Sequence, residues 1–335
     1  MGTLGAKRRP LPCQDEQMTA SGNTKLAVIG VGSVGTSLAY AALIRNSARE
    51  VVLFDVNAAK AEAEVLDLAH GTPFTGASRI AGGGEIDVVA DADMVVITAG
   101  AKQKPGQTRL DLAATNAGIL EQLMPQLLER APHAIYLLVT NPCDVLTVVA
   151  QQIAQLPAGR VFSSGTVLDS ARLRWLIAER AGIAARSVHA HIVGEHGDTE
   201  FPLWSGARIG PTPIREWTDD EGELLFPQTV LDQIRHDVVH AADRVIAGKG
   251  ATNYAIGLSG ARIVEAVLRN ERAVMQVSSV LHGYRGIDGV ALSVPSIVGS
   301  GGVERVLDVP MDAQELGHLQ ASADALRDSA RSIGH

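Results

Sequence analysis

Short apolar runs alternate with longer amphipathic segments along the first half of the chain, a pattern typical of a parallel sheet with crossover helices. Strands are predicted where apolar residues follow one another, and helices where apolar residues recur on one face of a 3.6-residue period. The predicted strands cover residues 25–29, 51–54, 94–99 and 135–139, and the predicted helices cover residues 34–45, 58–69 and 110–130. We therefore expect an α/β fold for this half.

The alternation loosens from about residue 163. Helical spacing returns at residues 169–181 and 231–246, and residues 188–193 have a strand-like pattern. Residues 312–331 combine helical spacing with mixed charge, which predicts a helix with one solvated face. Since 335 residues exceed what one core usually needs, we expect two domains. We place a first α/β domain at residues 24–162, an α+β second domain at residues 163–332, and a polar leader at residues 1–23, with Met18 as an alternative start.

Composition and charge exclude several classes of protein. Hydrophobic residues make up 46% of the chain and charged residues 20%, as in ordinary globular proteins. A net charge of −8 disfavours nucleic acid as a partner, and the sequence contains no apolar run long enough to cross a membrane. Cys13 and Cys143 are far apart and form no paired motif, so we expect neither a disulfide framework nor a metal site. These features favour a cytoplasmic location.

A glycine motif follows the first predicted strand. Residues 30–35 read GVGSVG and open the first predicted helix, which is the context that a dinucleotide-binding loop requires. Of Gly30, Gly32 and Gly35, one makes the tight turn, one lets the backbone approach a pyrophosphate, and one lets helix and strand pack closely. Asp55 follows the second strand, where a carboxylate accepts hydrogen bonds from a ribose and repels a 2′-phosphate. The motif predicts a Rossmann domain that binds NAD rather than NADP; a glycine turn that binds no dinucleotide is the alternative.

A second group of polar residues has the composition of a catalytic site. His196 lies in the glycine-bounded segment GEHGD, after an apolar stretch. Asp169 and Arg172 are one helical turn apart, so that a carboxylate and a guanidinium point into one site. Residues 103–109, QKPGQTR, follow the third predicted strand, at the edge where open α/β sheets hold ligands, and form a loop suited to a lid. Alone, His196 is more often a structural histidine than a catalyst.

Together these motifs closely resemble the L-lactate dehydrogenase branch of the lactate and malate dehydrogenase family, from about Lys25 to Arg331. The resemblance implies that His196 is the proton donor and acceptor and that Asp169 orients it. It also implies that Arg172 holds the substrate carboxylate in a two-pronged pair and that Arg109 polarises the carbonyl when the loop closes. Each role suits the chemistry of its side chain.

The same resemblance implies further contacts. Asn141 matches the asparagine that bonds the substrate oxygen near the nicotinamide, and Thr252 matches a residue that lines the substrate pocket. The alternative is that both bond only to backbone. Cys143 and Asn253 depart from the aliphatic and aromatic residues common there, and we expect Cys143 to serve packing. The full set of expected cofactor contacts is Gly30, Gly32, Ser33, Val34, Gly35, Asp55, Thr98, Ala99, Gly100, Asn116, Val139 and Asn141.

Gln103 distinguishes between substrates, because malate dehydrogenases carry an arginine at the matching position. A neutral glutamine favours pyruvate and L-lactate, since it offers no counter-charge to a second carboxylate. Lys102 and Lys104 leave malate dehydrogenase, or activity on another 2-hydroxy acid, open as an alternative. A protein that binds NAD without turnover is the alternative from a different class.

Arg174 and His189 match the positions at which many bacterial members of the family bind fructose 1,6-bisphosphate between the subunits of a homotetramer. A guanidinium and an imidazole are able to meet one phosphate, so we treat this pair as a hypothetical allosteric site. The alternative is a solvated helix arginine and a strand histidine that shares a face with His191.

Overall fold

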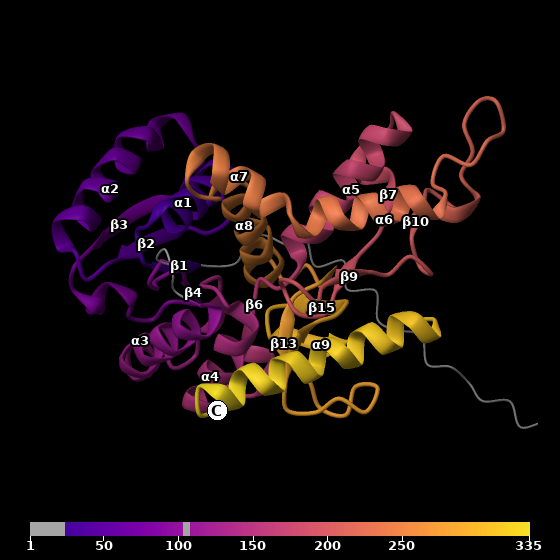
Figure 1. Ribbon diagram of the computed structural model, residues 1–335. Helices are drawn as coiled ribbons and strands as arrows, with labels where there is room; N and C mark the ends of the chain where they lie inside the picture. Colours follow the sequence, from indigo (N-terminus) through magenta and orange to yellow (C-terminus); the bar gives the residue numbers. More distant parts are fainter. Residues whose placement is uncertain (1–23, 103–107) are drawn as a thin grey trace, which may run out of the picture.

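The structure, a computed structural model, describes residues 24–102 and 108–335. Its centre is a sheet of eight strands within the described residues, in the order β14-β13-β6-β5-β4-β1-β2-β3 (Figure 1). Strands β1 to β6 pair in parallel, and β13 and β14 add an antiparallel edge. The strands are β1 (Lys25–Ile29), β2 (Glu50–Phe54), β3 (Arg79–Gly83), β4 (Met94–Ile97), β5 (Ile135–Leu138), β6 (Val161–Ser163), β13 (Ser278–Val280) and β14 (Ala291–Ser293).

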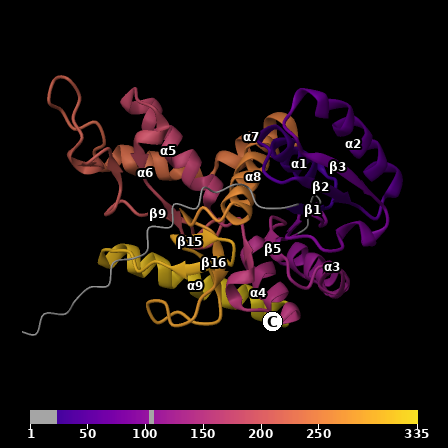
Figure 2. The same cartoon turned by 180° about the vertical axis from the view of Figure 1, so that it is seen from behind.

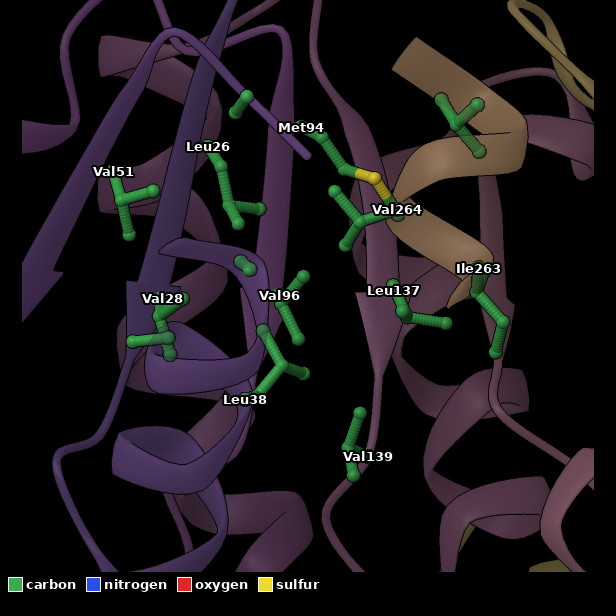
Figure 3. Packing of buried hydrophobic residues seen from close by; sticks show 14 of the residues in the cluster. Leu26, Val28, Leu38, Val51, Met94, Val96, Leu137, Val139, Ile263 and Val264 are labelled. Carbon is green, nitrogen blue, oxygen red and sulfur yellow. The ribbon is translucent and has the colours of Figure 1, made fainter. Parts of the chain in front are cut away.

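Helices cover both faces of this sheet, because its strands are apolar on both sides. Leu26 and Val28 of β1 pack with α1 and α8, as Figure 3 shows around Leu38 and Val264. The alternate residues of β1 pack with α3 and α4 on the other face. The helices are α1 (Ser33–Arg45), α2 (Ala58–Gly71), α3 (Arg109–Arg130), α4 (Cys143–Ala154) and α8 (Tyr254–Leu268).

Most of the other elements of the second half build a second layer beside the sheet (Figure 1). Helices α5 (Val167–Ala181) and α6 (Gln228–Val239) share a core with a small sheet, and α9 (Ala313–Ser332) runs past α4, as seen from behind in Figure 2. Short 3-10 turns are η1 (Thr72–Phe74), η2 (Ile86–Val89), η3 (Ala158–Arg160), η4 (Ala185–Ser187) and η5 (Ile214–Glu216). The other elements are α7 (Ala241–Lys249), β7 (Val188–His189), β8 (Ile192–Val193), β9 (Phe201–Pro202), β10 (Arg208–Ile209), β11 (Thr212–Pro213), β12 (Ala273–Met275), β15 (Ser296–Gly299) and β16 (Gly302–Val306).

Most predicted elements are confirmed, with ends that differ by one or two residues. One prediction is wrong in detail. The single helix expected at residues 231–246 is broken at His240, because α6 buries an apolar stripe against α5 whereas α7 has no buried residue. The strand-like pattern at residues 188–193 is confirmed as two short strands, of which β7 pairs with β10 and β8 pairs with β9.

Two elements of the second half belong to the main sheet. Strand β13 pairs with β6, and β14 pairs with β13, so the sheet extends past the predicted first domain. No helix in the described part of the chain has both the length and the apolar character needed to cross a membrane.

Candidate active site

The glycine motif forms a tight passage from β1 to α1. Gly30 has φ +95°, and a Cβ there would lie 2.7 Å from the backbone nitrogen of Ala99. A Cβ on Gly35 would collide with the carbonyl oxygen of Gly30. The position of Gly32 is different, because nothing lies within 4 Å of a Cβ built there. Space is therefore left in front of the helix N-terminus, where Ser33 and Val34 begin α1 and where backbone N–H groups attract an anion.

Asp55 lies beside this loop, directly after β2. One carboxylate oxygen accepts a hydrogen bond from the Val31 backbone at 2.9 Å, and the other accepts one from the Asn57 backbone at 2.9 Å. The same carboxylate borders a cavity of about 640 Å³. This cavity is also lined by Gly30, Gly32, Thr98, Ala99 and Gly100, all of which the sequence predicts as cofactor contacts.

Buried polar groups join the loops that follow β4 and β5. Asn116 is 1% exposed; its Oδ1 accepts from the Ala101 backbone at 2.7 Å, and its Nδ2 donates to the Asn141 carbonyl at 2.8 Å. Val139, directly after β5, donates its backbone N–H to Ile97. Asn116 thus holds the backbone of Asn141 in place, while the Asn141 side chain is exposed.

The structure brings His196, Asp169 and Arg172 together. Asp169, 1% exposed at the start of α5, contacts His196 Nδ1 through Oδ2 at 2.7 Å. Arg172, one turn along α5, donates from Nη1 to Asp169 Oδ1 at 2.6 Å. Each oxygen of the Asp169 carboxylate therefore has a cationic or hydrogen-bonding partner.

The surroundings favour the charged forms of this pair. Burial alone lowers the pKa of His196, but the charge and hydrogen bond of Asp169 outweigh it, and the net pKa is raised well above the ordinary histidine value. Burial opposes ionisation of Asp169, yet His196 and Arg172 lower its pKa. The arrangement can therefore deliver a proton from an imidazolium.

Two carboxylates of this site were missed by the sequence analysis. Asp144, on α4, accepts a hydrogen bond from the His196 backbone at 2.6 Å, and burial raises its pKa to about 6. Glu200 is 2% exposed, with Oε2 3.6 Å from His196 Nδ1. In the sequence, only the position of Glu200 four residues after His196 hints that it belongs to this site.

Other predicted site residues are placed less directly. Thr252 is partly buried just before α8, and Lys102 is exposed. The side chain of Arg109, at the start of α3, is not among the described ones, and Gln103 and Lys104 lie outside the described residues. Cys143 is buried, and burial raises its pKa to about 12, in keeping with a packing role.

Arg174 faces the interior of the second layer. It donates to the Ala190 carbonyl at 2.9 Å and contacts His191 Nδ1 at 3.1 Å and Gln276 Oε1 at 3.4 Å. His189 is exposed and lies opposite Arg208 in the small sheet. The structure thus joins Arg174 to His191 rather than to His189.

The chain matches two family models over nearly all of the described residues. The model described as lactate/malate dehydrogenase, NAD binding domain, matches residues 24–163. The model described as lactate/malate dehydrogenase, alpha/beta C-terminal domain, matches residues 166–334.

Individual proteins resemble the chain over the same length. An L-lactate dehydrogenase of Bifidobacterium animalis subsp. lactis is 47% identical over 93% of this chain and 97% of the relative. An L-lactate dehydrogenase of a Synechococcus species is 47% identical over 92% of this chain and 99% of the relative. The crystal structure of the minor L-lactate dehydrogenase from Enterococcus mundtii has a TM-score of 0.89 and 39% identity, covering 93% of this chain and 98% of that one.

Proposed function

Because this chain belongs to the lactate/malate dehydrogenase family and is an oxidoreductase that uses NAD, we propose that it is an L-lactate dehydrogenase that reversibly reduces pyruvate with NADH. The observation that carries this proposal is the 2.7 Å contact between His196 Nδ1 and the buried Asp169 carboxylate. That contact occupies one ring nitrogen and leaves Nε2 as the atom for proton transfer.

When bound, NADH would supply a hydride to the keto carbon of pyruvate. His196 donates the Nε2 proton to the keto oxygen, on which negative charge develops, and L-lactate forms. Asp169 stabilises the imidazolium before the transfer. In the reverse direction, neutral His196 takes the hydroxyl proton of L-lactate while the hydride leaves for NAD.

The substrate is held by arginines in this proposal. Arg172 is 18% exposed and bonds Asp169 through Nη1, and its planar guanidinium has further N–H groups with which to pair a carboxylate. We assign Arg109 to polarising the keto group, Asn141 to bonding the substrate oxygen, and Thr252 to the pocket wall. The neutral amide of Gln103 offers no counter-charge to a second carboxylate and therefore disfavours a dicarboxylate in this assignment.

The cofactor residues fit a dinucleotide. Gly30 and Gly35 leave no room for a Cβ, and Gly32 leaves open space at the N-terminus of α1. We assign the pyrophosphate to this space and the adenosine ribose to Asp55, which borders the adjoining cavity. The pocket behind it would be lined by Thr98, Ala99 and Gly100.

We extend the proposal to a cytoplasmic homotetramer that responds to fructose 1,6-bisphosphate. Arg174 and His189 supply a guanidinium and an exposed imidazole on neighbouring elements. Because Arg174 is bonded to Ala190 and His191, it would have to turn outward to meet a phosphate.

The test is NADH oxidation by the purified protein with pyruvate and, separately, with oxaloacetate, each with and without fructose 1,6-bisphosphate. We expect a strong preference for pyruvate, and we expect Gln103→Arg to shift the preference toward oxaloacetate by at least about 100-fold.

His196→Ala should lose about 100-fold to 10,000-fold in turnover while it still binds NADH. Oxaloacetate preference in the unaltered protein would favour a malate dehydrogenase in which Lys102 or Lys104 pairs with the second carboxylate. An unchanged rate with the bisphosphate would remove the allosteric assignment of Arg174 and His189.

A further inference from the structure

We propose that Glu200 is a second carboxylate partner of His196, which acts with Asp169 to position the imidazole and to favour its protonated form. This inference rests on the proposed function, because it assigns a positioning role within the same acid–base site. Glu200 acts through His196 and needs no contact with the substrate.

The geometry places both carboxylates against one ring nitrogen. One oxygen of Asp169, one nitrogen of His196 and one oxygen of Glu200 all lie within 4.8 Å of one another. Asp169 makes the short contact to Nδ1 at 2.7 Å, and Glu200 lies at 3.6 Å from the same atom. The nearer carboxylate therefore holds the proton of Nδ1, and the farther one adds its charge.

The local backbone directs Glu200 toward the imidazole. The chain turns tightly after His196, because the Glu200 backbone N–H donates to the Gly197 carbonyl at 3.3 Å. In return, the Gly197 backbone N–H donates to Glu200 Oε2 at 3.4 Å. Gly197 has φ +148°, a conformation that favours glycine. The turn thus fixes the side chain of Glu200 at the ring rather than in solvent, which agrees with its 2% exposure.

The charges that face His196 come from three parts of the chain. Helix α5 supplies Asp169 and Arg172, and helix α4 supplies Asp144, which binds the His196 backbone, and the thiol of Cys143. The loop itself supplies Glu200, whereas the carboxylate of Glu195, the residue before the histidine, accepts a hydrogen bond from Thr199 instead. Three buried carboxylates thus surround His196 with Arg172 as the cation bonded to Asp169.

Among the buried carboxylates around His196, Glu200 has the pKa nearest to neutral. Burial raises its pKa, the negative charge of Asp169 raises it further, and the result is about 7. The interaction with Glu200 in turn raises the pKa of His196. Ionised Glu200 therefore strengthens the imidazolium that pyruvate reduction requires, and a neutral group in its place weakens it.

The experiment compares full-length protein with its Glu200→Gln variant, which keeps the size of the side chain and removes the charge. We expect the alkaline limb of kcat/KM for pyruvate and the acidic limb of kcat/KM for L-lactate to move together to lower pH, by about one unit. Both limbs follow His196, since one direction needs it protonated and the other needs it neutral. The ¹⁵N resonances of His196, identified by their loss in His196→Gln, should titrate at correspondingly lower pH.

Glu195→Gln is the matched control, because the Glu195 carboxylate accepts a hydrogen bond from the Thr199 hydroxyl at 2.6 Å and does not contact the imidazole. The pH profiles of kcat/KM for this variant should coincide with those of the unaltered protein. If the pH profiles of kcat/KM and the ¹⁵N titration of His196 are the same in Glu200→Gln as in the unaltered protein, the inference is wrong, even if turnover falls at every pH. If the unaltered protein oxidises no NADH with pyruvate, the proposed function fails, and the ¹⁵N titration alone decides the role of Glu200. Should Glu200→Gln not fold, Glu200→Ser removes the same charge and is held to the same shift.

Discussion

The three glycines of the motif GVGSVG perform separable tasks at the residue scale. Gly35 has no space for even a methyl group, because the carbonyl oxygen of Gly30 lies where a Cβ would be. Gly32 has open space, extended backbone at φ −71° and ψ 179°, and the N-cap position of α1. Close packing therefore explains why position 35 requires glycine, whereas space for a ligand explains the glycine at position 32.

This separation predicts that Gly32→Asp folds normally and fails to bind NADH. Aspartate is a favourable N-cap residue, so the free energy of unfolding should change by less than about 1 kcal/mol. The new carboxylate occupies the space assigned to the pyrophosphate and repels it, and NADH affinity should fall by at least about 100-fold. NADH fluorescence titration measures the affinity, and urea unfolding measures the stability.

Gly35→Ala is the comparison, and it should lose both stability and affinity, since its methyl group forces the loop apart. Tight NADH binding by Gly32→Asp would show that the pyrophosphate lies elsewhere.

The residues that could be predicted from the sequence are those whose roles are encoded locally. Asp55 and Gly35 lie at fixed distances along the chain, and His196 stands in a glycine-bounded segment. Glu200 and Asp144 could not be found in this way, because their importance comes from burial against His196. An acidic residue in a polar segment is usually solvated, so the position of Glu200 four residues after His196 is too weak a signal to predict its burial.

At the element scale, an ion pair with a buried carboxylate joins α1 to α8. Arg45, in the last turn of α1, donates to both carboxylate oxygens of Glu265, at 2.8 Å from Nε and 2.6 Å from Nη2. The Glu265 side chain is 3% exposed, and Arg45 is 38% exposed. Ser47 also donates to this carboxylate, at 3.0 Å.

We expect Arg45→Met to destabilise the protein by about 2 kcal/mol, because it leaves a buried carboxylate without its bidentate partner. The value lies below that for a fully buried pair, since Arg45 is partly solvated and Ser47 remains. Arg130→Met is the matched control: Arg130 is also in the last turn of its helix, α3, but its partners Asp87 and Glu129 are 77% and 74% exposed. The control should lose less than about 1 kcal/mol. Equal losses in urea unfolding would contradict the view that burial decides the strength of these pairs.

Elements with strong periodicity were predicted well, and elements fixed by distant partners were not. Helix α3 carries helical spacing over its whole length, and β1 is a continuous apolar run. Helix α8 was not assigned, because Gly257 and Gly260, which lie against α1, lower the helix propensity of its first half. The break at His240 was missed because neither glycine nor proline marks it.

At the scale of the whole molecule, the two halves of the chain are interleaved. Helix α8 returns from the second half to pack on α1, and β13 and β14 extend the sheet beyond β6. Such contacts join segments far apart in sequence, so local patterns carry no record of them. The domain boundary at residue 162 stays a prediction. The main sheet contains strands from both sides of this boundary, because β13 pairs with β6.

A shared sheet predicts that both halves unfold together and that NADH stabilises both. All three tryptophans, Trp175, Trp204 and Trp217, lie in the second half, and the last two pack in its core. Tryptophan emission in urea therefore reports on the half opposite the glycine loop. We expect a single transition that NADH at about 100 times its Kd shifts by about 2.7 kcal/mol, with protein concentration held constant. Far-ultraviolet circular dichroism, which follows the whole chain, should shift equally. Gly32→Asp should show the same transition without the NADH shift. If NADH shifts the unfolding transition followed by circular dichroism but leaves the one followed by tryptophan emission unchanged, the two halves unfold independently. In that case the strands β13 and β14 do not couple them.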